Sequence, residues 1–482
     1  MVLIMAVSEH DTIAAIATPV GRGSIAAIRV SGPQAFQIVT RFLPAGKSLA
    51  ELSPRHSHLL WLSASDGARL DQITLIRYPA PNSYTGEDVV EIFCHGGRLA
   101  PNMILEQLCA AGCRLAAPGE FTRRAVFNHK LDLIQAESIA EIIDAESPVY
   151  LQNVLSHLEG AFSRQVSELR QRLLHACALL ELGLDFSEED VEFADRAQLQ
   201  AELTQLDAMI TRLLSGFERG QALKEGWKLA IIGKPNVGKS SLMNALLRHD
   251  RVIVSPIPGT TRDTVEERIR LGGHLFRLID TAGIRRLDLN SAPEFSPTRH
   301  LDAIEQIGIE RSRKAAQEAD IIVFVTDSSM PADYEDQVIA DACLARAAEP
   351  GLLGILHICN KTDLPESPQA FHFDHEQIAT IKTSARTSAG IDTLENALVD
   401  FIAKKSTVET NGVYYVNLRQ RLCLEKARAA LRAAEQSLQN NLSAEFVAVD
   451  LREVIYQLGM LIGEVSTEDI LGEIFANFCI GK

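Results

Sequence analysis

The sequence predicts three kinds of fold in one chain: an α+β N-terminal domain, an all-α helical domain, and an α/β domain inserted into the helical one. Residues 10–121 alternate short β-rich runs with Gly and Pro turns. Residues 130–224 and 415–478 repeat apolar residues at spacings of three and four, whereas residues 227–403 alternate strands with helical stretches. Because domain termini often lie close together and tolerate insertion, one interrupted helical domain is the simplest account. The predicted domains are 1–121, 122–225, 226–404 and 405–482.

The N-terminal domain is predicted from three β-rich runs and the turns between them. The turns are TPVGRGS (18–24), YPAPNSYTGE (78–87) and AAPGEF (116–121). From these residues alone, the glycines and scattered charges are best interpreted as structural turns. The expected strands are IAAIRV (25–30), QITLIRY (72–78) and DVVEIFC (88–94).

The helical and α/β segments follow in order along the chain. LDLIQAESIAEIIDA (131–145) and the stretch 155–182 are amphipathic at helical spacing, and the polar linker KKSTVETNG (404–412) precedes the last helical segment. Apolar strands that alternate with helices predict a doubly wound parallel sheet. The expected strands are KLAIIG (228–233), RVIVS (251–255), LFRLID (275–280), DIIVFVTD (320–327) and GILHICN (354–360).

The composition is that of an acidic globular protein. Of 482 residues, 46% are hydrophobic and 23% are charged, and 47 Lys and Arg against 63 Asp and Glu give a formal charge of −16. An acidic surface does not attract a polyanion as a whole. Any nucleic-acid partner must therefore meet a local basic patch or arrive with a second protein.

The eight cysteines are scattered, and Cys109 and Cys113 are the only close pair, without the spacing of a zinc site. The N-terminal MVLIMAV lacks a basic start and a cleavage site, so it is interpreted as the approach to a first strand. No apolar run approaches the roughly 20 residues that span a bilayer. These features predict a reduced, cytoplasmic setting and no membrane span.

The α/β segment carries the strongest chemical motif. GKPNVGKS (233–240) follows a predicted strand and opens a predicted helix, as the GxxxxGK[ST] motif requires. Backbone amides around Gly238 would hold phosphates, Lys239 would reach the β and γ oxygens, and the Ser240 hydroxyl would bind magnesium. A chance glycine-rich turn is the alternative, and the flanking strand and helix argue against it.

Further motifs follow in a fixed order. GTTRD (259–263) offers the Thr261 hydroxyl to magnesium, and DTAG (280–283) offers a carboxylate and a glycine amide. In NKTD (360–363), a carboxylate can accept hydrogen bonds from the N–H groups of guanine, and adenine has no such pair. Together the motifs predict a Ras-like domain that binds GTP. The predicted contacts are Asn236, Val237, Gly238, Lys239, Ser240, Ser241, Ser255, Thr260, Thr261, Asp280, Thr281, Ala282, Gly283, Asn360, Lys361, Asp363, Ser384, Ala385 and Arg386.

One position departs from Ras-like enzymes, which place a glutamine near DTAG to orient the attacking water. Here Ile284 follows DTAG directly. From the motifs alone, the group that orients the water stays open.

The whole chain resembles the MnmE (TrmE) family of tRNA-modifying GTPases. The resemblance is carried by the order of the GTPase motifs inside a helical domain and by the final FCIGK (478–482). It extends to the N-terminal region. The matching blocks there are TPVGRGSIAAIRVSG (18–32), PNSYTGEDVVEIFCHGG (81–97) and PGEFTRRAVFNHKLDL (118–133).

The resemblance implies a GTPase that depends on potassium, which supplies the charge that an arginine finger gives elsewhere. It also implies that Glu305 orients the water, although spacing alone favours a solvated helix charge at Glu305. Two features depart from the family: Pro256 and Pro258 stiffen the first switch, and the stretch 285–303 is longer than expected. The implied potassium ligands are Asn236, Ser255, Ile257 and Thr260.

For the N-terminal domain, the resemblance implies a homodimer interface and a site for 5-formyl- or methylene-tetrahydrofolate. Cys479 is either a small buried hydrophobe or a thiol beside the one-carbon unit. The implied folate-binding residues are Arg29, Glu91, Lys130 and Lys482.

By the same resemblance, the protein acts with an FAD- and NADH-dependent MnmG-type partner, in a heterotetramer, on the wobble uridine of certain tRNAs. The expected product carries a carboxymethylaminomethyl or aminomethyl group at C5. Two alternatives stay open: a GTP-gated ribosome or RNA assembly factor without covalent chemistry, and a folate enzyme in which the GTPase only regulates.

Overall fold

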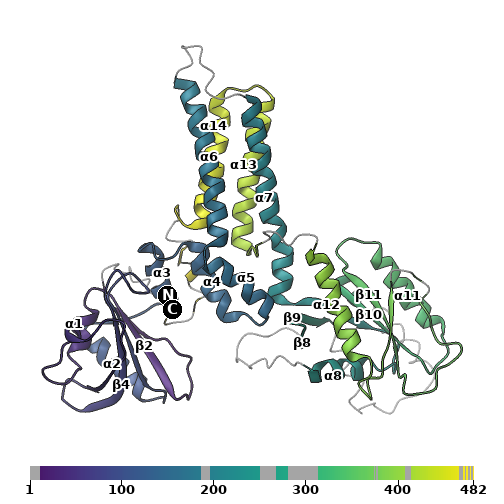
Figure 1. The fold of residues 1–482 in the computed structure, drawn as a ribbon, viewed down its shortest axis with the longest axis horizontal. Coiled ribbons are helices and arrows are strands. Elements are labelled where there is room, and N and C mark those ends of the chain that lie inside the picture. Colours follow the sequence, from purple (N-terminus) through teal and green to yellow (C-terminus); the bar gives the residue numbers. More distant parts are fainter. Residues whose placement is uncertain are drawn as a thin grey trace, which may run out of the picture. The chain divides into compact units, whose positions relative to one another are not determined.

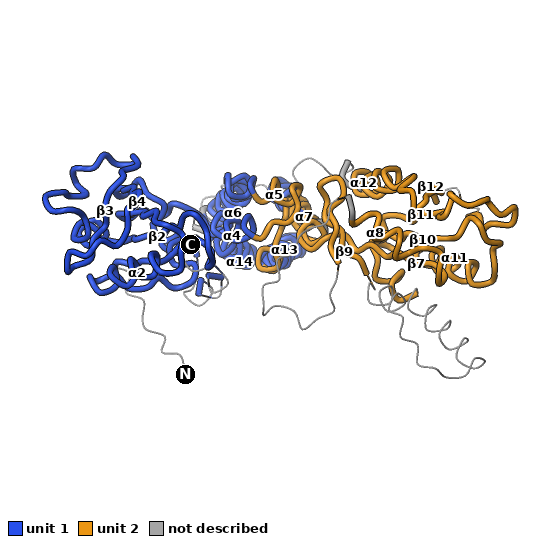
Figure 2. The backbone as a smooth tube through the Cα atoms, turned by 90° about the horizontal axis from the view of Figure 1, so that it is seen from below, with its two compact units in different colours: residues 1–143, 155–207, 423–482 blue, residues 144–154, 208–422 orange. Residues whose placement is uncertain are grey.

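The structure is a computed structural model that describes residues 11–185, 196–249, 267–279, 313–373, 375, 378–407 and 414–465, with 471, 472, 474, 475, 478 and 481. Contact density divides the chain into two compact units (Figure 2). Unit 1 comprises residues 1–143, 155–207 and 423–482, and unit 2 comprises residues 144–154 and 208–422. The four domain boundaries drawn from the sequence stay predictions.

In unit 1, the N-terminal region forms a six-stranded sheet with the order β3-β4-β5-β2-β1-β6. The β1–β6 pair is parallel and the other pairs are antiparallel. Alternate side chains of a strand point to opposite faces, so Ile28 and Val30 of β2 enter a core with α1 and α2, while Arg29 points to the other face. The strands are β1 (Ile13–Ile16), β2 (Ile25–Ser31), β3 (His58–Ser63), β4 (Arg69–Tyr78), β5 (Val89–His95) and β6 (Arg114–Leu115). The helices are α1 (Ala35–Thr40), the 3₁₀ turn Leu49–Glu51, α2 (Ala100–Ala110) and α3 (Glu120–Phe127).

A network of buried charges fastens the edge of this sheet to α3. The Glu120 carboxylate, fully buried, lies 2.6 Å from Arg114 and 3.1 Å from Arg124. Arg124 also reaches Asp11 at 2.7 Å and Glu87 at 3.1 Å. Burial opposes ionisation of Glu120, but hydrogen bonds from Arg114 and from the amide of Ala117 hold its pKa below the usual range. The network therefore depends on the charge of the buried Glu120 carboxylate.

The remainder of unit 1 is helical (Figure 1). Helices α6 and α14 pack along each other, and two ion pairs attach the neighbouring helices: Arg172–Glu202 at 2.6 Å and Arg428–Asp207 at 3.0 Å. The helical pattern over 155–182 is interrupted at Gly160, whose φ of 78° ends one helix before the next begins. The helices are α4 (Leu133–Asp144), α6 (Ala161–Asp185) and α14 (Ala444–Ile462), with parts of α5 (Pro148–Leu158), α7 (Arg196–Glu225) and α13 (Leu418–Gln439), whose other residues are assigned to unit 2.

The C-terminal segment belongs to the packing of unit 1. Phe475 and Phe478 are buried with Leu133 of α4. Gly481 is buried and has a positive φ of 98°. A Cβ placed on Gly481 would lie 2.6 Å from the carbonyl oxygen of Ile16, so the segment lies directly against the end of β1.

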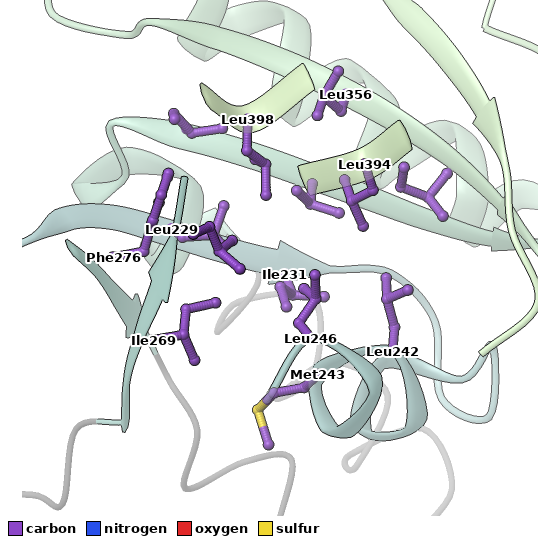
Figure 3. Close-up of a cluster of buried hydrophobic side chains, with 14 of the residues drawn as sticks. Leu229, Ile231, Leu242, Met243, Leu246, Ile269, Phe276, Leu356, Leu394 and Leu398 are labelled. Atoms are coloured by element: carbon purple, nitrogen blue, oxygen red, sulfur yellow. The ribbon is translucent and has the colours of Figure 1, made fainter. Parts of the chain in front are cut away.

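Unit 2 contains a second six-stranded sheet, with the order β12-β11-β10-β7-β9-β8. All its pairs are parallel except β8–β9. Leu229 and Ile231 of β7 enter a core with α8 and α12 (Figure 3), while Ala230 and Ile232 enter a second core with α11. The strands are β7 (Trp227–Ile232), β8 (Glu267–Leu271), β9 (His274–Ile279), β10 (Ile321–Asp327), β11 (Gly354–Asn360) and β12 (Ala379–Lys382); the helices are α8 (Lys239–His249), α11 (Tyr334–Ala347) and α12 (Ile391–Thr407).

Cores on both faces of a mostly parallel sheet confirm the doubly wound α/β prediction. The mixed sheet and the helices of unit 1 confirm the other two predicted fold classes. The predicted strand at 251–255 lies outside the described residues. No helix in the described part of the chain is both long and apolar enough to cross a membrane.

The β8–β9 hairpin is held by the connection between α4 and α5. Arg268 pairs with Glu146 at 2.9 Å, and Arg270 donates to the Glu146 carbonyl oxygen at 2.5 Å. The buried Ser147 hydroxyl donates to the Gly273 carbonyl oxygen at 2.9 Å. Unit 2 therefore recruits residues 144–154 from the helical part of the sequence.

The buried charge network should contribute strongly to the stability of the N-terminal sheet. Glu120→Gln keeps the shape of the side chain but removes the fully buried negative charge from two arginines that keep Asp11 as a partner, which costs about 1–3 kcal/mol. Urea unfolding is expected to show this loss. Glu106→Gln on the exposed side of α2 is the control, with a change within about 0.5 kcal/mol. Equal stability of the two variants would contradict the role given to Glu120.

Candidate functional site

The loop between β7 and α8 follows a path that needs glycine at two positions. Gly233 has a φ of 149°, and a Cβ there would lie 2.2 Å from the carbonyl oxygen of Val325. Gly238 has a φ of 98°, and a Cβ there would lie 2.3 Å from the side-chain nitrogen of Asn360. Between them, Asn236 has a φ of 64° and is exposed. The loop is thus fitted closely against β10 and β11, as a phosphate-binding loop requires.

Lys239 is the first residue of α8 and folds back over this loop. Its ammonium donates to the carbonyl oxygens of Gly233 at 2.8 Å and Lys234 at 2.6 Å. Burial lowers the pKa of Lys239 to about 8. The next residue, Ser240, is partly buried, and its hydroxyl makes no hydrogen bond to another described residue. The start of a helix also favours anions through its unpaired amides.

The second residue of the loop is fixed by a contact that the sequence did not predict. The Lys234 ammonium lies 2.6 Å from Asp333 and 2.8 Å from Asp336. These two aspartates also form the capping box at the start of α11. The only signal in the sequence was an Asp-x-x-Asp pair ahead of a helix, which predicts a cap and not an ion pair.

Asn360, at the end of β11, joins the phosphate loop to the predicted base loop. Its side chain is buried and donates to the Val237 carbonyl oxygen at 2.9 Å. Its side-chain oxygen accepts from the Ala385 amide at 3.1 Å and from the Thr383 hydroxyl at 3.3 Å. The motifs at 233–240, 360–363 and 383–386, far apart in sequence, therefore meet at one edge of the sheet.

The remaining base-loop residues form polar contacts with Asp363 and Asp327. The Ser384 hydroxyl donates to the Asp363 carboxylate at 2.7 Å, and Arg386 lies 3.9 Å from the other oxygen of that carboxylate. Lys361 pairs with Asp327 at the end of β10, at 2.6 Å. Burial opposes ionisation of Asp327, but Lys361 and Ser329 hold its pKa below the usual value. Sequence reasoning did not identify Asp327.

The structure therefore brings together those predicted GTP contacts that it describes: residues 236–241, 360, 361, 363 and 384–386. The other predicted contacts, magnesium and potassium ligands and the water-orienting glutamate lie outside the described residues. They are Ser255, Ile257, Thr260, Thr261, Asp280, Thr281, Ala282, Gly283 and Glu305.

In unit 1, two of the predicted folate-binding residues pair directly. Arg29 of β2 and Glu91 of β5 are opposite each other in register, and Arg29 donates to one Glu91 oxygen at 2.8 and 3.1 Å. The guanidinium lies 4.8 Å from the centre of the Tyr84 ring and 5.6 Å from that of Phe121. Arg29 is therefore flanked by aromatic rings, and no spacing pattern in the sequence predicts these contacts.

Lys130 and the C-terminal segment both contact the N-terminal region of unit 1, at different points. The Lys130 side chain lies beside Gly86, within the loop that carries Tyr84. Gly481 contacts Ile16 and Ala17, and the neighbouring Ala15 pairs with Arg29 across the sheet. Cys479 and Lys482 lie outside the described residues.

The two sites differ in the chemistry that they can support. The first offers a glycine-lined loop, a lysine and a carboxylate-bearing base loop, which suit a purine nucleotide. The second offers a guanidinium and a carboxylate beside aromatic rings, which suit a planar polar ligand. Among the described residues, no three His, Cys, Asp or Glu side chains gather as a metal site.

Comparisons with known proteins agree with both halves of the chain. A family model described as "GTP-binding protein TrmE N-terminus" matches residues 12–130, and one described as "MnmE helical domain" matches residues 133–479. Three relatives carry the name tRNA modification GTPase MnmE. They are from Flavobacterium johnsoniae (37% identical, covering 98% of this chain and 100% of the relative), Salinibacter ruber (39%, 98% and 100%) and Akkermansia muciniphila (40%, 98% and 99%). The resemblance predicted from the sequence is confirmed, and the chain belongs to the MnmE (TrmE) family.

Proposed function

We propose that this protein is a GTP-hydrolysing tRNA modification protein. With an FAD- and NADH-dependent MnmG-type partner, it would help to add a carboxymethylaminomethyl or aminomethyl group at C5 of the wobble uridine. The observation that carries the proposal is the convergence on Asn360, which joins a phosphate loop to a guanine-type base loop. The names of the relatives supply the connection to tRNA.

In this proposal, GTP binding rearranges contacts that exist within the chain. The Lys239 ammonium exchanges two backbone carbonyl oxygens for the β and γ oxygens of the nucleotide. The Asp363 carboxylate accepts hydrogen bonds from the N–H groups of guanine. Lys234 keeps its aspartate partners and fixes the start of the loop while Lys239 moves.

The described residues fit both proposed cations. The Ser240 hydroxyl has no hydrogen-bond partner among the described residues and can bind magnesium beside the phosphates. The exposed Asn236 makes no side-chain hydrogen bond in the described part and lies on a left-handed turn. Its oxygen can therefore contact potassium, which would supply positive charge to the β and γ oxygens. The nucleotide-driven change would order loops that relax after hydrolysis.

The Arg29–Glu91 pair has unused hydrogen-bonding atoms that fit a tetrahydrofolate. One terminal nitrogen of Arg29 makes no hydrogen bond within the described part, and the second Glu91 oxygen accepts only a long contact from Tyr78, at 3.4 Å. A folate carboxylate and pterin N–H groups would use these atoms. Lys130, Lys482 and the Cys479 thiol would complete the site, and the homodimer would form through this domain.

The proposed potassium site predicts a response to the identity of the cation. GTP turnover should rise strongly when sodium is replaced by potassium at constant ionic strength, because an oxygen cage fits one ionic radius. Asn236→Ala should remove most of that rise. The measurement is phosphate release in the two salts, and equal wild-type rates would contradict the proposal.

The lowered pKa of Lys239 predicts how GTP affinity depends on pH. Phosphate favours the charged ammonium, so the pKa of Lys239 must be higher in the complex than the value of about 8 without nucleotide. Affinity should be level between pH 7 and 8, and should fall above pH 8 by up to about tenfold per pH unit. Titrations with a fluorescent GTP analogue test this. Lys239→Arg, whose guanidinium stays protonated, is the control and should show no break near pH 8.

The tRNA function is tested by nucleoside mass spectrometry of tRNA from a deletion strain that carries plasmid copies. Lys239→Ala should lose GTP binding and the modified wobble uridine together. Cys479→Ser should keep potassium-stimulated GTP hydrolysis and dimerisation but lose the modified uridine. Normal modification with Lys239→Ala would refute a GTP-dependent role in modification and would favour a different task for the chain.

A further inference from the structure

Unit 1 contains a cavity of about 720 Å³ that neither candidate site uses. It opens beside the end of β5, four residues beyond Glu91, where the chain turns into α2. A cavity of this size is within the range of ligand pockets. Its wall includes Arg22, Leu70, His95, Arg98, Leu99 and Met103.

Two arginines of this cavity carry positive charge without compensation. Arg22 and Arg98 are exposed, and neither has a carboxylate partner in the described part of the chain. Two unpaired guanidinium groups that line one cavity suit a phosphate, which they can bind with two parallel hydrogen bonds each.

A third polar group of the cavity, the His95 imidazole, is held in a fixed orientation. The Asp71 carboxylate lies 2.7 Å from the Nδ1 atom of His95 and also accepts from the His95 amide at 2.9 Å. Burial opposes ionisation of Asp71, but these contacts hold its pKa below the usual value. The Nε2 atom makes no hydrogen bond to another described residue. The imidazole is therefore oriented by one nitrogen and has the other for a ligand.

The rest of the wall combines a helix start with apolar side chains. Leu99, the N-cap of the 11-residue α2, and Ala100, the first residue of α2, both line the cavity, so the positive end of this helix lies there. Leu99 provides no side-chain cap. Leu99 and Met103 are large apolar residues with 72% and 39% of their surface exposed. Cationic groups next to apolar contact area match a nucleotide, which presents a phosphate beside a flat base.

Charge distribution supports the same ligand. Residues 11–130 contain 12 Lys and Arg against 9 Asp and Glu, a net charge of +3, although the whole chain carries −16. A polyanion is repelled by most of such a protein and is attracted to this domain. Resting on the proposed function, we propose that this cavity binds a phosphate-bearing stretch of the tRNA substrate, with Arg22, Arg98 and His95 as its contacts.

The test uses the full-length protein and fluorescently labelled tRNA, with binding followed by anisotropy over a range of salt concentrations. Arg22→Ala/Arg98→Ala should bind tRNA about tenfold more weakly, and the slope of log K against log salt should decrease by about 1–2, as two lost phosphate contacts require. The matched control, Arg41→Ala/Lys47→Ala, removes the same charge from exposed positions of the same domain. It should retain nearly the wild-type affinity.

Competition distinguishes the source of the phosphate. If uridine 5′-monophosphate displaces tRNA from the wild type, the cavity accepts one nucleotide; if inorganic phosphate and the mononucleotide both fail at millimolar concentration, it recognises extended RNA. Either result supports the proposal when the Arg22/Arg98 variant alone is weakened. Equal affinity of the two double variants, or no binding of tRNA by the wild type, would overturn it. GTP turnover should be unchanged in both variants. The experiment can therefore reject the proposed tRNA contact without rejecting the proposed dependence of tRNA modification on Lys239.

Discussion

The nucleotide site depends on one buried amide, the side chain of Asn360. It donates to the phosphate loop and accepts from the base loop. It also lies so close to position 238 that only glycine, which has no Cβ, fits there. A buried amide that loses a partner costs about 1–3 kcal/mol for each unsatisfied group, so the two loops cannot move apart cheaply. The contacts of Lys239 with Gly233 and Lys234, and of Lys361 with Asp327, form on a loop arrangement that this amide already fixes.

The parts of this site that could be predicted are those that sequence order determines. Parallel strands end at one edge of a sheet, so motifs that follow strands were expected to meet there, and those at 233–240 and 360–363 do. The Lys234–Asp333 and Lys361–Asp327 pairs could not be predicted in this way. The first pair joins residues that are 99 positions apart and the second joins residues that are 34 positions apart. Predicting either pair requires knowledge of which strands are neighbours. The strand order that places β10 between β7 and β11 is a tertiary property with no local signal.

The N-terminal domain shows the same limit more severely. Glycine turns and scattered charges gave no pattern from which the aromatic cover of Arg29 could be inferred, because Tyr84 and Phe121 lie on a loop and a helix outside its strand. Asp11 and Arg124, 113 residues apart, also meet only after the sheet has formed. Family resemblance singled out Arg29 and Glu91 as folate contacts, but it did not predict that the two residues pair with each other.

The anchoring of the β8–β9 hairpin bears on the modularity of the inserted domain. An inserted domain is usually self-sufficient, since its own core and termini define it. Here Arg268, Arg270 and the carbonyl oxygen of Gly273 take their partners from Glu146 and Ser147, which precede the insertion in the sequence. In a fragment cut at the ends of the inserted segment, these groups would be exposed to water, and the hairpin would lose its contacts with Glu146 and Ser147. The excised domain therefore lacks contacts that the same domain makes within the chain. Replacement of this domain by a related one would preserve the hairpin contacts only if the new domain also matched Glu146 and Ser147.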